Sequence, residues 1–160
     1  MPFIQNIIYL CTIKKQMFSK TCEYAIRAML FIAQKSKSGS KTGIREIAAG
    51  IDAPEHFIAK ILQGLVRKGM LQSLKGPTGG FYLDKESMRS SFADIVKVID
   101  GDNLFSGCGL GLRICSEVKP CPIHNQFKII RKNIYNMLEQ AKIGEFSRKL
   151  ERDLVFLNQQ

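Results

Sequence analysis

Three cysteines and a histidine lie close together in the second half of this 160-residue chain. Cys108, Cys115 and Cys121 are separated by six and then five residues, and His124 follows three positions after the last of them. Thiolates and imidazole are ligands of zinc and of iron-sulfur clusters. The three cysteines lie within a long stretch, residues 103–122, that is rich in turn formers and weakly periodic, and His124 follows it. Long structureless loops in compact domains are usually either disordered or functional, and a set of metal-ligand residues in such a loop predicts a metal site.

The spacing leaves the kind of metal open. The short interval from Cys121 to His124 suits a structural zinc site, whereas the wider intervals suit a larger inorganic core. A third interpretation has no metal at all, because reduced thiols in the cytosol can sense oxidants directly. The other two cysteines need no function: Cys22 lies among apolar residues, and Cys11 lies in an N-terminal extension.

The charge of the chain identifies a class of partner. Lys and Arg number 24 against 14 Asp and Glu, which makes the net charge +10. Residues 1–90 carry 14 basic and 6 acidic side chains, a net of +8, whereas residues 91–160 carry 10 and 8, a net of +2. The N-terminal half therefore faces a polyanion, either nucleic acid or an anionic membrane surface. No run approaches the roughly 18 apolar residues of a spanning helix, and a cytoplasmic protein without a membrane partner is the expectation.

The basic half contains the periodicity of three helices. Ser19 is a candidate N-cap for a first helix that runs to about residue 35. A second covers residues 44–49, and Gly50 is predicted to end it in the left-handed conformation. A third covers residues 54–68, with Asp52 and Glu55 as a capping box and one apolar stripe.

Two short strands around a glycine-rich turn are predicted for residues 70–84. A short helix, a tight turn, a longer helix and such a hairpin are typical of a winged helix-turn-helix, with the hairpin as the wing. The polar face of the third helix and the tip of the hairpin could reach base edges or phosphates. The residues that we expect to contact double-stranded DNA are Ser19, Lys20, Glu55, His56, Lys60, Gln63, Arg67, Lys75, Gly76 and Thr78.

A short amphipathic helix at residues 92–99 precedes the cysteine-rich loop, and a long helix at residues 125–141 follows it. The long helix has apolar residues at alternating steps of three and four, as in a coiled coil. This seam comprises Phe127, Ile130, Ile134, Met137 and Ala141. It packs either against the chain's own core or against a second copy. We expect a homodimer, because helix-turn-helix proteins usually read the paired half-sites of a palindromic operator.

Motifs of the common enzyme classes are missing from the sequence. It has two histidines, no Walker motif, no nucleophile elbow and no candidate pair of catalytic carboxylates. We therefore expect a binding protein and not an enzyme. An iron-sulfur carrier whose basic charge is incidental is the alternative from a different class.

Several segments together resemble the Rrf2 family of bacterial winged-helix transcription regulators, which includes IscR and NsrR. They are FSKTCEYAIRAMLFIA, IREIAAGIDAPEHFIAKILQGLVRKGML, KGPTGGFYL and the cysteine cluster, between about residues 17 and 150. The resemblance implies a mainly α fold with a small β wing and a long C-terminal dimerisation helix. It also implies that the third helix enters the major groove of DNA and the wing the minor groove. A repressor is the expected regulator.

Three thiols followed by a histidine are similar to the arrangement that holds a 2Fe-2S cluster in IscR-type members. The resemblance thus implies Cys108, Cys115, Cys121 and His124 as ligands of an iron-sulfur cluster that air can remove. One departure is the first interval, with six intervening residues where IscR-type members have five. The implied organisation is an extension at 1–16, a winged helix-turn-helix at 17–101, a cluster-binding loop at 102–124, and a dimerisation helix with a C-terminal segment at 125–160. Members usually start where Met17 stands, so no function is expected of the extension.

Overall fold

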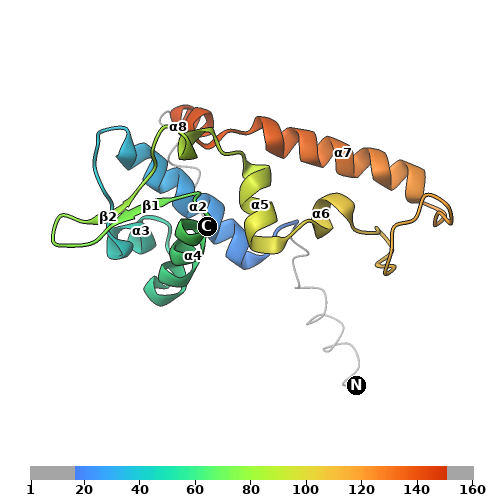
Figure 1. Cartoon of the computed structure of the whole chain (residues 1–160), viewed down its shortest axis with the longest axis horizontal. Coiled ribbons are helices and arrows are strands. Elements are labelled where there is room, and N and C mark those ends of the chain that lie inside the picture. The colour runs from blue at the N-terminus through green and yellow to red at the C-terminus, as the bar shows by residue number, and fades with distance from the viewer. Residues whose placement is uncertain (1–16, 151–160) are drawn as a thin grey trace, which may run out of the picture.

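A computed structural model describes residues 17–150 of the chain (Figure 1). The predicted extension, with Cys11, and residues 151–160 of the predicted C-terminal segment lie outside the described residues. The elements in chain order are α2 (Lys20–Ser36), α3 (Ile44–Gly50), α4 (Glu55–Arg67), β1 (Gln72–Leu74), β2 (Gly80–Tyr82), η1 (Ser87–Arg89), α5 (Phe92–Asp100), α6 (Asn103–Ser106), α7 (His124–Gln140) and α8 (Ile143–Leu150). The expected mainly α fold with a small two-stranded sheet is confirmed.

The main core lies where α2, α3 and α4 pack together. Its fully buried side chains include Met29, Ile47 and Leu62, one from each helix. Burying a side chain of this size contributes about 1.5–3 kcal/mol to stability. Ile143 of α8 belongs to the same core. After the long α7 the chain thus returns to the body formed by α2, α3 and α4, and α8 completes the core of this body.

Two details of the predicted helix ends are wrong. Gly50 does not end α3 in the left-handed conformation, because it is the last residue of the helix and Asp52 has the positive φ, 51°. Gly50 is needed for space instead: a Cβ there would lie 2.3 Å from Cε2 of Phe31. Asp52 and Glu55 form no capping box either, since Pro54 is the N-cap of α4.

The wing is an antiparallel hairpin in which Gln72 pairs with Tyr82 and Leu74 with Gly80. A backbone bridge attaches it to the body: the Thr42 N–H donates to the Phe81 carbonyl, and the Phe81 N–H donates to the Thr42 carbonyl, both at 2.9 Å. Gly80 lies beside this bridge with φ of 143°. A Cβ at Gly80 would lie 2.8 Å from the Thr42 carbonyl oxygen, so the close approach of the two backbones requires glycine.

We therefore expect Gly80→Ala to lower the free energy of unfolding by about 1–3 kcal/mol, because it combines backbone strain with a clash against backbone atoms. Gly64→Ala is the matched control. Gly64 lies inside α4, where a Cβ would have nothing within 4 Å and φ is not positive, so alanine should add up to about 1 kcal/mol. Urea unfolding measures both. Equal effects would contradict this role of Gly80.

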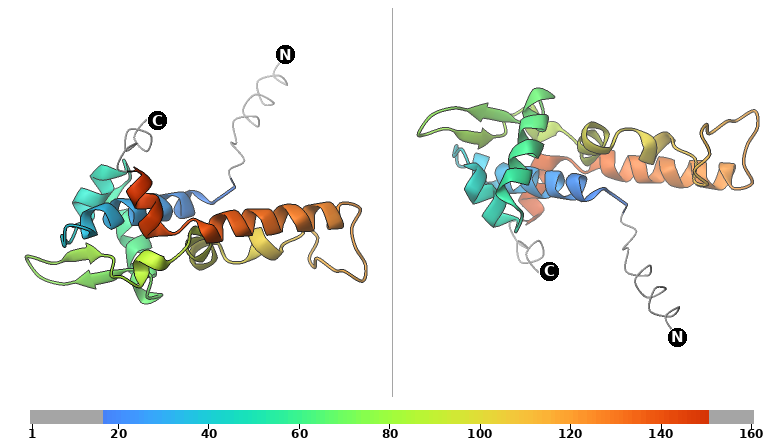
Figure 2. Two further views of the ribbon diagram at one scale, coloured as in Figure 1. Left: turned by 90° about the horizontal axis from the view of Figure 1, so that it is seen from above. Right: turned by 90° about the horizontal axis from the view of Figure 1, so that it is seen from below.

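The chain beyond α5 forms an arm that extends from the body (Figure 2). It consists of α6, the irregular residues 107–123 and α7. The short helix α6 occupies the beginning of the predicted loop. His124 is the first residue of α7 and not the last residue of the loop. A capping box at Ser91 and Asp94 starts α5, and Gly101 ends it with φ of 77°.

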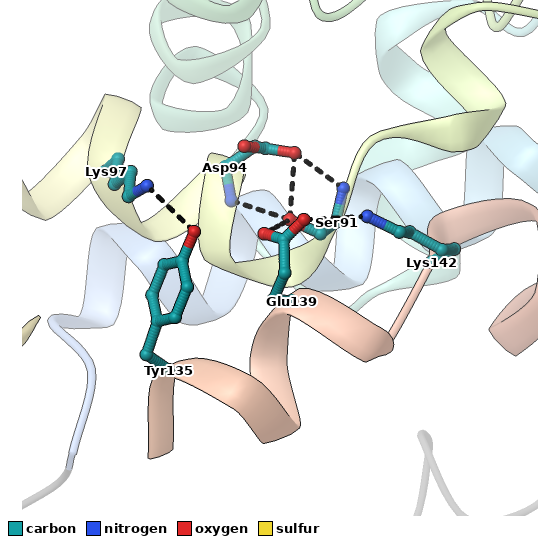
Figure 3. A network of polar contacts seen from close by, with 6 residues as sticks. All are labelled: Ser91, Asp94, Lys97, Tyr135, Glu139 and Lys142. Atoms are coloured by element: carbon teal, nitrogen blue, oxygen red, sulfur yellow. Dashed lines mark hydrogen bonds and ion pairs between the residues drawn. The ribbon is translucent and has the colours of Figure 1, made fainter. Parts of the chain in front are cut away.

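A polar network attaches the arm to the body where α7 ends (Figure 3). The buried Ser91 hydroxyl lies 2.8 Å from Asp94 Oδ2 and 3.0 Å from Glu139 Oε2. Lys142 donates to the other oxygen of Glu139 at 3.0 Å and holds the pKa of this carboxyl below its usual range, aided by Ser91. One turn earlier, Tyr135 lies beneath the Lys97 ammonium, 4.7 Å from the ring centroid. These contacts fix the orientation of α7 relative to α5.

Candidate DNA-binding surface and cysteine site

Helix α4 has a buried apolar stripe on one side and an exposed polar face on the other. Ile58, Leu62 and Leu65 have no exposed surface. All five side chains of this helix that were predicted to reach DNA are exposed: Glu55, His56, Lys60, Gln63 and Arg67. Glu55 lies 3.6 Å from the Arg45 guanidinium of α3, so its charge is partly neutralised by a neighbour. A helix anchored on one side and polar on the other can enter a major groove.

The wing continues this surface. Lys75, Gly76 and Thr78 are exposed at the tip of the hairpin. Between α4 and the wing lies a cavity of about 420 Å³, lined by Gln63, Arg67 and Lys75 among others. The three side chains come from two elements but border one depression, which fits a phosphate backbone passing between helix and wing.

The start of α2 already has partners within the chain. The Ser19 hydroxyl accepts from the Cys22 N–H at 3.0 Å, which confirms it as the N-cap. It also donates to Asp100 at the end of α5, and the Ser19 N–H donates to the same carboxylate at 2.9 Å. Lys20 pairs with Glu23 at 3.1 Å. Both predicted DNA contacts at this helix start therefore compete with contacts inside the molecule.

The four predicted metal ligands lie in two pairs. Cys115 Sγ is 3.4 Å from Nδ1 of His124, a histidine that is 6% exposed. The Cys121 side chain hydrogen-bonds to Cys108. No group of three or more His, Cys, Asp or Glu side chains within residues 17–150 is close enough to hold a metal. The structure thus brings the four residues into one region without assembling them as a common ligand set.

The thiols differ in their surroundings. Backbone hydrogen bonds at Leu110 and Leu112 hold the pKa of Cys108 below its ordinary value, and Cys121 and Arg131 act in the same direction. Cys22 is different, as expected from its apolar neighbours. It is fully buried, and desolvation, with help from Asp100, raises the pKa of its thiol to about 12. Cys22 is therefore an inert packing residue.

Sequence reasoning missed one residue at the cysteine site. Arg131 of α7 is 8% exposed, and its Nη1 lies 3.4 Å from Cys115 Sγ. The same nitrogen donates to the Gly107 carbonyl and, at 2.8 Å, to the Ser106 carbonyl. The only signal in the sequence was its position, since Arg131 lies one helical turn after Phe127 and next to Ile130 of the predicted seam.

The predicted seam of α7 has some residues that face solvent and others that pack against the chain's own core. Ile130 and Met137 are 51% and 55% exposed, and Ile129 beside them is 63% exposed. Ile134 instead packs into a second core with Leu138 and Cys22. Phe127 is partly buried, and a Cβ at Gly109 would lie 2.9 Å from its ring. Ala141 is the C-cap at the bend before α8. Only the outer part of the seam is open to a second copy.

The donor chemistry of the site fits a thiolate-bound metal centre. Three thiols and an imidazole are suitable ligands. The buried Arg131 guanidinium lies beside Cys115, and its Nε has no hydrogen-bond partner in the described part of the chain, which fits an anionic group in this place. Helices that could span a bilayer do not occur within residues 17–150.

The chain matches known proteins over most of its length. Residues 18–149 match the profile of the Rrf2 family, described as iron-dependent transcriptional regulators. A helix-turn-helix-type transcriptional regulator of Aquifex aeolicus (strain VF5) is 30% identical over 139 residues, which are 86% of this chain and 95% of that protein. CymR, the global cysteine regulator of B. subtilis, superposes with a TM-score of 0.68 at 20% identity, over 82% of this chain and 96% of that one.

IscR of T. potens superposes with a TM-score of 0.64 at 20% identity, over 84% of this chain and 89% of that one. At these identities the two structures support a common fold and nothing finer.

Proposed function

Because the chain belongs to the Rrf2 family of transcriptional regulators, we propose that it binds an operator as a homodimer and that an iron-sulfur cluster held by its cysteines controls this binding. The matching proteins are regulators of transcription, and this chain is accordingly a DNA-binding regulator and not an enzyme or an iron-sulfur carrier. The cytoplasm is the proposed compartment, and repression of a promoter that overlaps a palindromic operator is the proposed outcome.

The exposed polar face of α4, continued by the basic wing, supports the operator as the partner. Gln63, Arg67 and Lys75 border one depression between the two elements. Arg can recognise guanine by a bidentate contact, and Lys can neutralise phosphate. We propose that α4 reads bases in the major groove and that the wing follows the backbone into the minor groove.

The single observation that carries the metal proposal is the convergence of the cysteine loop on the buried Arg131. Cys108, Cys115, Cys121 and His124 would hold the cluster, and 2Fe-2S is the proposed type from the resemblance to IscR-type members. When bound, such a cluster supplies a reversible one-electron centre that is sensitive to iron supply, oxidants and nitric oxide.

A chain of contacts links the cysteine loop to the start of α2, where Ser19 and Lys20 are predicted DNA contacts. Arg131 connects Cys115 with the end of α6 through the Ser106 carbonyl. Helix α6 follows α5 after Gly101, and Asp100 at the end of α5 binds Ser19 at the start of α2. We propose that a change in the loop shifts α6 and alters how firmly Asp100 holds this helix start. Operator affinity would change because Ser19 and Lys20 are released or withheld from phosphate.

The test compares cluster-loaded protein with a Cys115→Ala variant, both purified without oxygen. The wild type should be reddish-brown and contain iron and sulfide, and Cys115→Ala should contain neither. On duplexes selected by the wild type from a random-sequence library, the two affinities should differ by about 5- to 150-fold, the usual range of allosteric coupling. Cys22→Ala is the control, because it removes a thiol from the core and should keep both the cluster and the affinity.

Equal affinities would contradict the switch, and a colourless wild type containing zinc would contradict the cluster.

A second candidate, a thiol switch without metal, is favoured by the contact between Cys108 and Cys121 and by the lowered pKa of Cys108. In that case the anaerobic protein is colourless and metal-free, and reversible oxidation of Cys108 and Cys121 changes operator affinity.

A further inference from the structure

Arg131 is a buried cation without a carboxylate partner. Its guanidinium contacts the carbonyls of Ser106 and Gly107, the Cys115 thiol and the ring of Phe127. Within residues 17–150 no Asp or Glu forms an ion pair with it. A buried charge is usually paired, because its desolvation is otherwise uncompensated. Arginine cannot avoid this desolvation cost by losing its proton, so the site lacks a negative group to compensate the buried charge.

One nitrogen of the guanidinium indicates where an anionic partner of Arg131 would bind. Arg131 is only 8% exposed, and its Nε is buried with no hydrogen-bond partner among residues 17–150. Buried donors without partners are rare in folded proteins. Nη1 of the same group already serves two carbonyls and one thiol. Nε is thus a buried donor that can still serve an acceptor at the cysteine site.

The neighbours of Arg131 keep it in place. The Phe127 ring centroid lies 5.5 Å from the guanidinium carbon, an i, i+4 cation–π contact along α7. On the loop side, Gly109 packs closely against the same ring: a Cβ at this position would lie 2.9 Å from Cγ of Phe127. The guanidinium is therefore held between α7 and the cysteine loop, next to Cys115 and with its charge also acting on Cys108.

We propose that Arg131 is the charge-compensating positioning residue of the cysteine site, and that its Nε donates a hydrogen bond to the anionic group that the cysteines bind. This inference rests on the proposed function. Three thiolates bring negative charge into the site, and a buried positive charge beside them stabilises the bound state and, more strongly, its one-electron-reduced form. Arg131 should therefore raise the midpoint potential of the bound cluster and slow its loss.

The experiment compares four chains reconstituted with iron and sulfide without oxygen: wild type, Arg131→Met, Arg131→Lys and Lys132→Met. Lys132 is the matched control, because it is the next residue of α7, carries the same charge and is exposed. The measurements are iron and sulfide per chain, the midpoint potential, the rate of cluster loss to a chelator, and the thermal unfolding of the cluster-free proteins. The last of these checks that each variant folds.

We expect Arg131→Met to lower the midpoint potential and to accelerate cluster loss by about 10- to 100-fold, the usual effect of removing a residue that supports metal ligands. Arg131→Lys keeps the charge but has no planar fork, so it should restore most of the potential while the loss remains faster than in the wild type. Lys132→Met should match the wild type. If Arg131→Met does not fold, the comparison of Arg131→Lys with Lys132→Met still decides, through the rate of loss.

Unchanged potential and unchanged rate of loss in the Arg131 variants would overturn the inference, while leaving the proposed regulator intact. A wild-type chain that takes up no iron and sulfide would overturn the cluster proposal and this inference with it. Altered unfolding of the cluster-free variants with a wild-type potential would show a purely structural role and would also overturn the inference.

Discussion

Replacing Lys60, Arg67 and Lys75 together by glutamate should weaken binding to the selected duplexes by about 1000-fold or more. The three cations lie on α4 and the wing, and a dimer presents each of them twice. Reversal removes their phosphate and base contacts and adds repulsion from the DNA backbone. All three side chains are exposed, so the fold should be retained. Fluorescence anisotropy at several salt concentrations measures the affinity and its dependence on salt.

The matched control reverses Lys132, Arg148 and Lys149. These side chains are exposed on α7 and α8, and α8 lies on the side of the body opposite α4 (Figures 1 and 2). The control changes the net charge by the same amount and should bind nearly as well as the wild type. The affinity of the wild type should fall steeply with salt, and the α4 and wing variant should show a shallower slope. Equal losses in both triple variants, or a flat salt dependence of the wild type, would contradict the assignment of this surface.

The second large effect is expected at α7. Ile130→Asp combined with Met137→Asp should convert a dimer into a monomer, because it places two charges on the exposed apolar strip that we propose as the contact between copies. DNA affinity should then fall by about 100- to 10000-fold, since two linked half-site contacts become one. Sedimentation equilibrium gives the mass, and anisotropy gives the affinity.

Lys132→Asp with Asn136→Asp is the control on the same helix. Both residues are exposed, and their positions on the helical wheel point away from Ile130 and Met137. This variant should keep the mass of a dimer. A wild type that is monomeric at all concentrations, or a variant with aspartate at both Ile130 and Met137 that remains dimeric, would contradict the proposed interface.

Much of the fold follows from local patterns in the sequence. Ser19 caps the first helix as predicted, since capping depends on residues within one turn. The apolar stripe of α4 and the hairpin that follows it are also where periodicity and glycine content indicate them. Gly50 shows the limit of such reasoning. Its glycine is required by the ring of Phe31, a residue nineteen positions earlier, and no rule about helix ends contains that contact.

The sequence by itself determined which chemistry is available. The types and spacing of Cys108, Cys115, Cys121 and His124 indicate soft metal ligands, and the charge of the first 90 residues indicates a polyanion. These properties depend on side-chain composition and on neighbours in the chain, so they can be read without a fold.

The tertiary structure decided which groups meet. It pairs Cys115 with His124 and Cys108 with Cys121, divides the seam of α7 into an inner and an outer part, and joins Asp100 to Ser19 across 81 positions. Above all it buries Arg131 beside the Cys115 thiol, and no Asp or Glu within residues 17–150 forms an ion pair with it. Burial and unmet hydrogen bonds arise from packing between distant segments, and for this reason the sequence alone did not reveal Arg131, the residue that we propose to support the cysteine site.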